Sequence, residues 1–304
     1  MAAIIFMKFA FSKYSRFYYI LSSLLISASI LSLVFYGLKF GIEFTGGSII
    51  EAQFQQRPSN DAILKSLEGF NLGEIIVQPS GENEAIIRTK GVDEETHQNI
   101  LSKLRELSPI EEKRFDYIGP SIGEELTGKI ELAIFLTLLA ITLYIAFAFR
   151  KVSKPVSSWK YGIASLVALI HDIIIPLGVF SVLGKFYNIE ITVPIVAALL
   201  TILGFSVHDT IIIFDRIREN ILRRGGGSFS EVVDWSLNQT LGRSISTVVT
   251  VLIVLLSLFI FGGETLRYFS LALIIGIISG TYSSIFLASP LLISWHNKNL
   301  KKRS

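Results

Sequence analysis

The sequence predicts an α-helical polytopic membrane protein with six transmembrane helices and one small α+β domain between the first and second helices. Of the 304 residues, 51% are hydrophobic and only 17% are charged, whereas an ordinary soluble domain carries about 25% charged residues. The charges are also segregated, because 16 of the 25 acidic residues lie between Glu43 and Glu125. This pattern indicates a polar domain inserted into apolar sequence.

Six apolar runs account for the predicted helices. A helix needs about 20 mostly apolar residues to cross the hydrocarbon core of a bilayer. Runs of this kind occur at residues 17–38, 130–149, 162–183, 191–214, 244–261 and 269–293. The first run is longer than the apolar part of a signal peptide, which has about 7 to 15 residues, so we interpret it as an uncleaved anchor.

Basic residues predict the orientation, because short cytoplasmic loops are rich in Lys and Arg. Sixteen of them fall on one predicted side: Lys8, Lys13, Arg16, Arg150, Lys151, Lys154, Lys160, Arg216, Arg218, Arg223, Arg224, Arg243, Lys298, Lys301, Lys302 and Arg303. The two short loops opposite hold only Lys185 and Arg267. We therefore expect the terminal segments 1–16 and 294–304 in the cytoplasm and residues 39–129 on the far side of the membrane.

The segment 39–129 has the pattern of a soluble domain. Alternating apolar residues predict strands at 47–54, 75–78, 85–89 and 113–118, and helices are expected at 60–67 and 93–107. The order β-α-β-β-α-β is that of the ferredoxin-like fold. We expect His97 to stand among polar neighbours, and we see no catalytic constellation. The chain has no Cys, which excludes disulfides, thiolate metal sites and a Cys nucleophile. A non-enzymatic module that contacts a partner is expected.

Ionisable residues inside the apolar runs are candidates for function, because burying a charge in a membrane is costly. His171 and Asp172 lie near the middle of the third run, and His208 and Asp209 lie near the cytoplasmic end of the fourth. Arg243 opens the fifth run, where its side chain could reach Asp209. Two interpretations stay open: a fixed ion pair that joins two helices, or a carboxyl that binds and releases a proton.

The roles of the other polar and small residues also stay open. Asp172 could belong to a proton pathway or only hydrogen-bond locally, and His208 could relay protons or simply pack. In the sixth run, Gly276, Gly280 and Ser284 recur every four residues, which favours close helix packing within the chain or against a partner. Gly225–Gly227 lacks the Lys-Ser/Thr of a phosphate loop, so no ATP site or other cofactor is expected.

Several motifs together resemble the SecF family of bacterial protein-export subunits. They are Phe44-Thr45-Gly46-Gly47, Gly119-Pro120-Ser121-Ile122-Gly123, Gly204-Phe205-Ser206-Val207-His208-Asp209-Thr210, Phe214-Asp215-Arg216-Ile217-Arg218-Glu219-Asn220, Asn238-Gln239-Thr240-Leu241-Gly242-Arg243 and Gly280-Thr281-Tyr282-Ser283-Ser284. They occur in order at the junctions of the six runs and cover nearly the whole chain. Two positions depart from the family pattern: His208 replaces the usual Asn, and Gly242 replaces a frequent Ser.

The resemblance implies a partner, an energy source and a location. A SecF-like chain would pair with SecD beside the SecYEG channel in the bacterial inner membrane, and would contact the translocating polypeptide and the lipid bilayer but no nucleic acid. Protons would drive it, with Asp209 and Arg243 in their path. We expect the turns at Phe44, Thr45, Gly46, Gly47, Gly119 and Gly123 to pass helix movement to the outer domain.

Two other functions are compatible with the residues alone. A half-size proton-driven exporter of lipids or small molecules would share the bundle, although the short outer segment argues against a drug-binding pocket. A passive assembly scaffold would not need the charge of Asp209.

Overall fold

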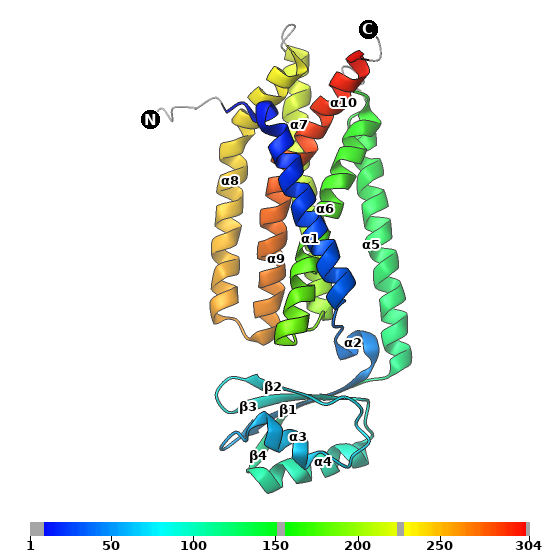
Figure 1. Cartoon of the computed structure of the whole chain (residues 1–304), viewed down its shortest axis with the longest axis vertical. Coiled ribbons are helices and arrows are strands. Elements are labelled where there is room, and N and C mark those ends of the chain that lie inside the picture. Colours follow the sequence, from blue (N-terminus) through cyan, green and yellow to red (C-terminus); the bar gives the residue numbers. More distant parts are fainter. Residues whose placement is uncertain (1–8, 151–155, 224–227, 302–304) are drawn as a thin grey trace. The chain divides into compact units, whose positions relative to one another are not determined.

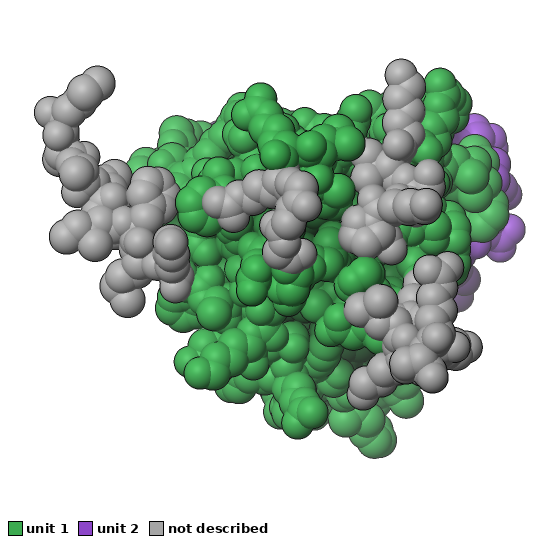
Figure 2. Space-filling view, turned by 90° about the horizontal axis from the view of Figure 1, so that it is seen from above, with its two compact units in different colours: residues 1–39, 133–189, 194–304 green, residues 40–132, 190–193 purple. Residues whose placement is uncertain are grey.

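The computed structural model describes residues 9–150, 156–223 and 228–301, and it divides the chain into two compact units (Figures 1 and 2). The first unit comprises Met1–Lys39, Ala133–Ile189 and Pro194–Ser304, and the second comprises Phe40–Leu132 and Glu190–Val193. The glycine run Gly225–Gly227, which was tested above against the phosphate-loop motif, lies outside the described residues, as do Lys8, Lys151, Lys154, Arg224, Lys302 and Arg303.

The second unit contains the predicted α+β domain. Its elements are β1 (Gly47–Phe54), α3 (Asn60–Ser66), β2 (Ile76–Ser80), β3 (Glu84–Thr89), α4 (Glu94–Leu107) and β4 (Ile110–Ile118). The strands form one antiparallel sheet in the order β2-β3-β1-β4. This confirms the predicted β-α-β-β-α-β arrangement, because β1 and β3 occupy the centre of the sheet and β2 and β4 its edges.

Alternation along the strands builds the core of this domain. Every second residue of β1 from Ile50 to Phe54 is buried, as are Ala85 and Ile87 of β3, and these side chains pack on the apolar residues of α3 and α4. Ser59 and Asp93 cap the two helices by accepting hydrogen bonds from backbone N–H groups of the first turn.

His97 is a buried residue of the α+β domain, although its neighbours in the sequence are polar. It is 4% exposed, its ring stacks on Phe115 at 3.7 Å between centroids, and its Nε2 lies 2.8 Å from Glu112 Oε1. Its burial follows from its position on α4, because residue 97 shares a helix face with Ile100, Leu101 and Leu104. His97 is therefore part of the interface between α4 and β4.

The glycine motifs before β1 and after β4 pack on each other. The short helix α2 (Ile42–Thr45) ends at Gly46, which has φ 72°. A side chain on Gly46 would come within 2.9 Å of Pro120, and one on Gly123 within 2.5 Å of the carbonyl oxygen of Phe44. Only glycine permits this combination of positive φ and close backbone approach. By contrast, Gly119 has no positive φ, and a side chain there would come no closer than 3.8 Å to its nearest neighbour, the hydroxyl of Tyr117.

Long helices make up nearly all of the first unit, and two of them begin in the second. They are α1 (Ser15–Tyr36) with the 3-10 turn η1 (Phe11–Tyr14) before it, α5 (Pro120–Ala148), α6 (Ser158–Tyr187), α7 (Val193–Arg223), α8 (Phe229–Phe261), α9 (Glu264–Ser283), the π-helical segment η2 (Ser284–Ala288) and α10 (Ser289–Lys301). Within the described residues, six helical stretches are long and apolar enough to cross a membrane, as predicted.

Two helices begin well before the expected positions. The helix α5 starts at Pro120 rather than residue 130, and α8 starts at Phe229 rather than residue 244. Proline is favoured in the first turn of a helix, where its missing N–H is not needed. A capping box formed by Ser228 and Glu231 fixes the start of α8. Both helices thus extend beyond their apolar runs, and Arg243 lies within α8 instead of opening it.

Small residues bring the helices of the bundle close together. The helix α1 packs on α6, α6 on α9, and α9 on α8. A side chain on Gly178 of α6 would come within 2.4 Å of Ser29 of α1. A side chain on Gly276 of α9 would meet Ile202 of α7 at 2.1 Å. The stripe of small residues in the sixth run therefore packs within the chain.

Candidate functional site in the helical bundle

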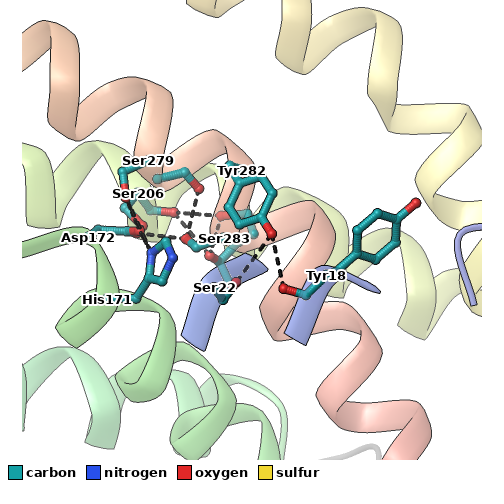
Figure 3. A network of polar contacts seen from close by, with 11 residues as sticks. Tyr18, Ser22, His171, Asp172, Ser206, Ser279, Tyr282 and Ser283 are labelled. Carbon is teal, nitrogen blue, oxygen red and sulfur yellow. Dashed lines mark hydrogen bonds and ion pairs between the residues drawn. The ribbon is translucent and has the colours of Figure 1, made fainter. Parts of the chain in front are cut away.

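Asp172 is the centre of a hydrogen-bond network between three helices (Figure 3). Its side chain on α6 is fully buried. Oδ2 accepts from Ser206 Oγ of α7 at 2.5 Å and from Ser283 Oγ of α9 at 2.8 Å, and Oδ1 accepts from Ser279 Oγ at 3.1 Å. These donors supply the hydrogen bonds that a buried carboxylate needs.

His171 supplies a fourth contact to the same carboxyl. Its Nδ1 lies 2.9 Å from Asp172 Oδ1, and its ring stacks on Tyr282 with the centroids 5.9 Å apart. The ring is fully buried, and Nε2 has no hydrogen-bond partner among the described residues. If the neutral ring donates from Nδ1–H to the carboxylate, Nε2 carries only a lone pair. A lone pair without a partner costs less free energy in an apolar environment than an N–H without a partner.

Asp209 on α7 has fewer hydrogen-bond donors around it than Asp172, within the described residues. It is 2% exposed, and its carboxyl accepts a hydrogen bond from Thr281 Oγ1 of α9 at 3.2 Å. No ion pair to Asp209 occurs within the described residues. A buried carboxylate with a single neutral donor is costly in free energy. Gaining or losing a proton at Asp209 therefore changes the free energy of this packing arrangement.

Arg243 and His208 do not join the two carboxyls. The side chain of Arg243 is exposed on α8 and makes no ion pair with Asp209, contrary to the contact that the sequence suggested. The expectation assumed that Arg243 stood at the end of a helix, from where a long side chain could turn inward. His208 is exposed and points away from the buried face of α7, as its position one residue before Asp209 requires.

Hydroxyl groups extend the network along the bundle. Thr210 Oγ1 of α7 lies 2.7 Å from Ser284 Oγ, and Ser284 Oγ also donates to the backbone oxygen of Ser206 at 3.4 Å. Ser284 is the first residue of the π-helical segment η2, and such segments often occur at functional sites. We call the whole set the bundle polar cluster: His171, Asp172, Ser206, Asp209, Thr210, Ser279, Thr281, Ser283 and Ser284.

Tyr282 connects the region to α1. Its hydroxyl donates to the backbone oxygen of Tyr18 at 3.1 Å and accepts from Ser22 Oγ at 3.2 Å (Figure 3). Apart from Ser284, which was expected only as a packing residue, the hydroxyls of this network were not predicted as site residues, because serine and threonine are frequent in membrane helices. Within the described residues, no group of three or more His, Cys, Asp or Glu side chains could hold a metal ion.

Comparison with known proteins connects this bundle to a family. Residues 99–298 match the family described as "Protein export membrane protein SecD/SecF, C-terminal", and residues 31–56 match the "SecD/SecF GG Motif". A protein translocase subunit SecF from Thermobaculum terrenum is 43% identical over 93% of this chain and 92% of its own length. The chain belongs to the SecD/SecF family. A SecF subunit from Vibrio alginolyticus is 38% identical over 93% of this chain and 88% of its own length.

Solved structures agree with this family assignment. The crystal structure of SecDF, described as a translocon-associated membrane protein, from Thermus thermophilus matches 98% of this SecF-family chain with a TM-score of 0.87 and 31% identity. A second SecDF structure, in a super-membrane-facing form, matches 97% with a TM-score of 0.71 and 32% identity. This chain spans 40% of the length of either protein.

These comparisons support a non-catalytic subunit of the protein translocase that is embedded in a membrane by several helices. The match to the GG motif includes Phe44–Gly47, where α2 ends and β1 begins. Every described helix that contributes to the bundle polar cluster lies within the larger matched region, residues 99–298.

Proposed function

We propose that this chain works with SecD beside the SecYEG channel and uses the proton motive force to complete the movement of polypeptides across the bacterial inner membrane. The observation that carries the proposal is the buried carboxyl of Asp209, which accepts a hydrogen bond from Thr281 and has no ion-pair partner within the described residues. Family membership favours polypeptide export over the alternative of a half-size exporter of lipids or small molecules.

Proton coupling requires a group whose protonation favours one arrangement of the bundle over another. Protonated Asp209 fits the present packing, in which its neighbour is the neutral hydroxyl of Thr281. A charged Asp209 needs water or a cation, and Arg243 on α8 is a cation whose side chain has no ion-pair partner in the described residues. Deprotonation would then attract Arg243 toward Asp209 and change the position of α8 relative to α7.

The other candidate residues have supporting roles in this proposal. Asp172 holds α6, α7 and α9 together through its four hydrogen-bond partners. These contacts fix Asp172 between the helices, so we assign proton exchange to Asp209 and not to Asp172. His208 is exposed and is assigned no step.

Both termini are proposed to be cytoplasmic, with the α+β domain on the far side. Single cysteines at two exposed positions test this, because the chain has none of its own. A membrane-impermeant thiol reagent added to intact cells should label Asn83→Cys in the domain and leave Asn297→Cys of α10 unlabelled. Permeabilised cells should show both labelled. The opposite pattern in intact cells would reverse the orientation.

The decisive experiment compares Asp209→Asn, Arg243→Met and the double variant. Asparagine keeps the shape of the side chain and removes its titration, so proton-dependent export of a reporter polypeptide should be lost while protein level and association with SecD stay normal. Arg243→Met should impair the same step, because the charged form of Asp209 loses its cation. The double variant should resemble the singles. Export and protein level are measured for all three, with and without a protonophore.

Other outcomes identify the competing functions. A structural ion pair predicts reduced protein level in each single variant and recovery in the double, because one buried charge is no longer left alone. A passive scaffold predicts normal export by Asp209→Asn, and that result would overturn the proposal.

A further inference from the structure

The segment Glu190–Val193 joins the outer domain although it follows α6 in the sequence. It belongs to the same compact unit as the β-sheet. The backbone N–H of Gly41 donates to the carbonyl oxygen of Ile191 at 2.9 Å, and Phe40 and Ile191 form a parallel β-bridge. The segment between α6 and α7 is thus hydrogen-bonded to the residues that lead into the domain, Phe40 and Gly41.

An ion pair adds a second attachment. Arg88 of β3 places Nε 3.1 Å from Glu190 Oε2, and Nη1 donates to Gln78 Oε1 of β2 at 2.5 Å. The Arg88 and Glu190 side chains are 13% and 6% exposed. Arg88 follows Ile87 in β3, so it projects from the sheet face opposite the helix-packed core. The guanidinium therefore connects two strands of the sheet to Glu190.

The burial of this pair makes it unlike the exposed ion pairs of the domain. The Lys103 and Glu106 side chains of α4, for comparison, are 45% and 63% exposed. Exposed pairs contribute about 0 to 1 kcal/mol, whereas loss of one partner of a buried pair leaves an uncompensated charge. Arg88 and Glu190 therefore resist separation.

Glu190 also lies directly before the helix that carries Asp209. The helix α7 begins at Val193 and continues to Arg223. Asp209 lies about 24 Å along it from Val193, at about 1.5 Å per residue. One end of this single helix is thus attached to the sheet, while its middle carries the proposed proton-binding group.

We propose that the Arg88–Glu190 pair is a coupling contact that transmits the displacement of α7 to the β-sheet of the outer domain. This inference rests on the proposed function, since it needs a proton-driven movement of α7. It adds a route that the glycine turns do not supply, because those turns connect α1 and α5 to the domain.

Charge variants in the full chain, assembled with its partner subunit, test the contact. Glu190→Gln keeps the size of the side chain and leaves the Arg88–Gln78 hydrogen bond in place. It should lower proton-dependent export by about two- to thirty-fold, the range seen when coupling residues are changed. Protein level should remain normal. The exchanged pair Arg88→Glu with Glu190→Arg should recover much of the loss. Lys103→Gln, which breaks an exposed pair in the same domain, is the matched control and should have no effect.

A reversible cross-link provides a second test that does not depend on charge. Arg88→Cys with Glu190→Cys removes the ion pair, and a short bis-methanethiosulfonate reagent then joins the two unique thiols. Export should be low in the reduced protein and should rise toward the parent rate after cross-linking. Unchanged export in Glu190→Gln and in the reduced double-Cys protein would overturn the coupling contact.

Comparison with Asp209→Asn separates the two proposals. Loss of export in Asp209→Asn together with normal export in the Arg88 and Glu190 variants would reject only the coupling contact. Normal export in Asp209→Asn would reject proton coupling itself. A fall in protein level for Glu190→Gln that the exchanged pair does not restore would assign Glu190 to folding and would also overturn the coupling contact.

Discussion

Asp172 and Asp209 are both buried carboxyls of the same helical bundle, yet their surroundings are opposite. Within the part of the chain that the structure describes, Asp172 has four hydrogen-bond partners from three helices, and Asp209 has one, the hydroxyl of Thr281. A carboxylate that is fully hydrogen-bonded holds its neighbours in one arrangement. One with few partners gains more from a change of protonation or of position. The difference indicates which carboxyl keeps the bundle together and which one can act as a switch.

The largest predicted effect tests this difference directly. Asp172→Ala leaves several buried hydroxyls and His171 without their acceptor, and should lower stability by about 3 kcal/mol or more. Asp209→Ala leaves only the Thr281 hydroxyl, and should cost about 1 to 2 kcal/mol. Thermal unfolding of the detergent-solubilised full chain measures both. Equal losses would remove the distinction between the two carboxyls.

A smaller effect is expected where the backbone of α9 approaches Asp172. In Gly280→Ala the new Cβ would lie 2.9 Å from Ser206 Cβ and 3.4 Å from Asp172 Oδ2. This overpacking should cost about 1 to 3 kcal/mol. Gly204→Ala on α7 is the matched control, because nothing lies within 4 Å of its Cβ. The same thermal unfolding experiment should show no loss for Gly204→Ala, and a tolerated Gly280→Ala would mean that the Asp172 network adapts easily.

The smallest predicted effect concerns Asp93, a carboxyl that is exposed to solvent and can be compared with the two buried ones. Asp93 caps α4, and hydrogen bonds from Thr96 hold the pKa of Asp93 below its usual 3.8. A lowered folded-state pKa means that its contribution to stability is present above the unfolded value and is lost as the pH falls through the folded one. The Thr96 amide should be better protected from hydrogen exchange in the parent chain than in Asp93→Asn near neutral pH, and this excess should be smaller at about pH 3, below the unfolded-state pKa. A constant excess at both pH values would contradict it.

Hydropathy and alternation were sufficient for the elements of the fold but not for their ends. Strands β1 and β3 of the α+β domain alternate between buried and partly exposed positions, and each of the six apolar runs lies in a helix. The start of α8 was missed although Ser228 and Glu231 form a readable capping box. The polar helical turns after that cap resemble a loop in a hydropathy profile. This error in turn misplaced Arg243 relative to Asp209.

The site was predictable only in part, because its charged members are rare in apolar sequence and its hydroxyl members are not. Asp172 and Asp209 were found as isolated carboxyls. Ser206, Ser279 and Ser283 could be recognised as partners of Asp172 only when α7 and α9 were placed against α6. The spacing of Ser279 and Ser283, four residues apart on one helix face, was the available signal.

The π-helical segment η2 also fixes the rotation of the chain that follows it. One residue more per turn than an α-helix shifts the phase of all later side chains by about 100°. Ser283 before the segment faces Asp172, and Leu292 and Ile293 after it are buried in the apolar core. Without this extra residue, a helix that directs Ser283 toward Asp172 would give Leu292 the direction that Ile293 has here and would turn Ile293 by about 100° from its present position. The segment thus lets one continuous helix present a polar face to one layer of the bundle and an apolar face to the next.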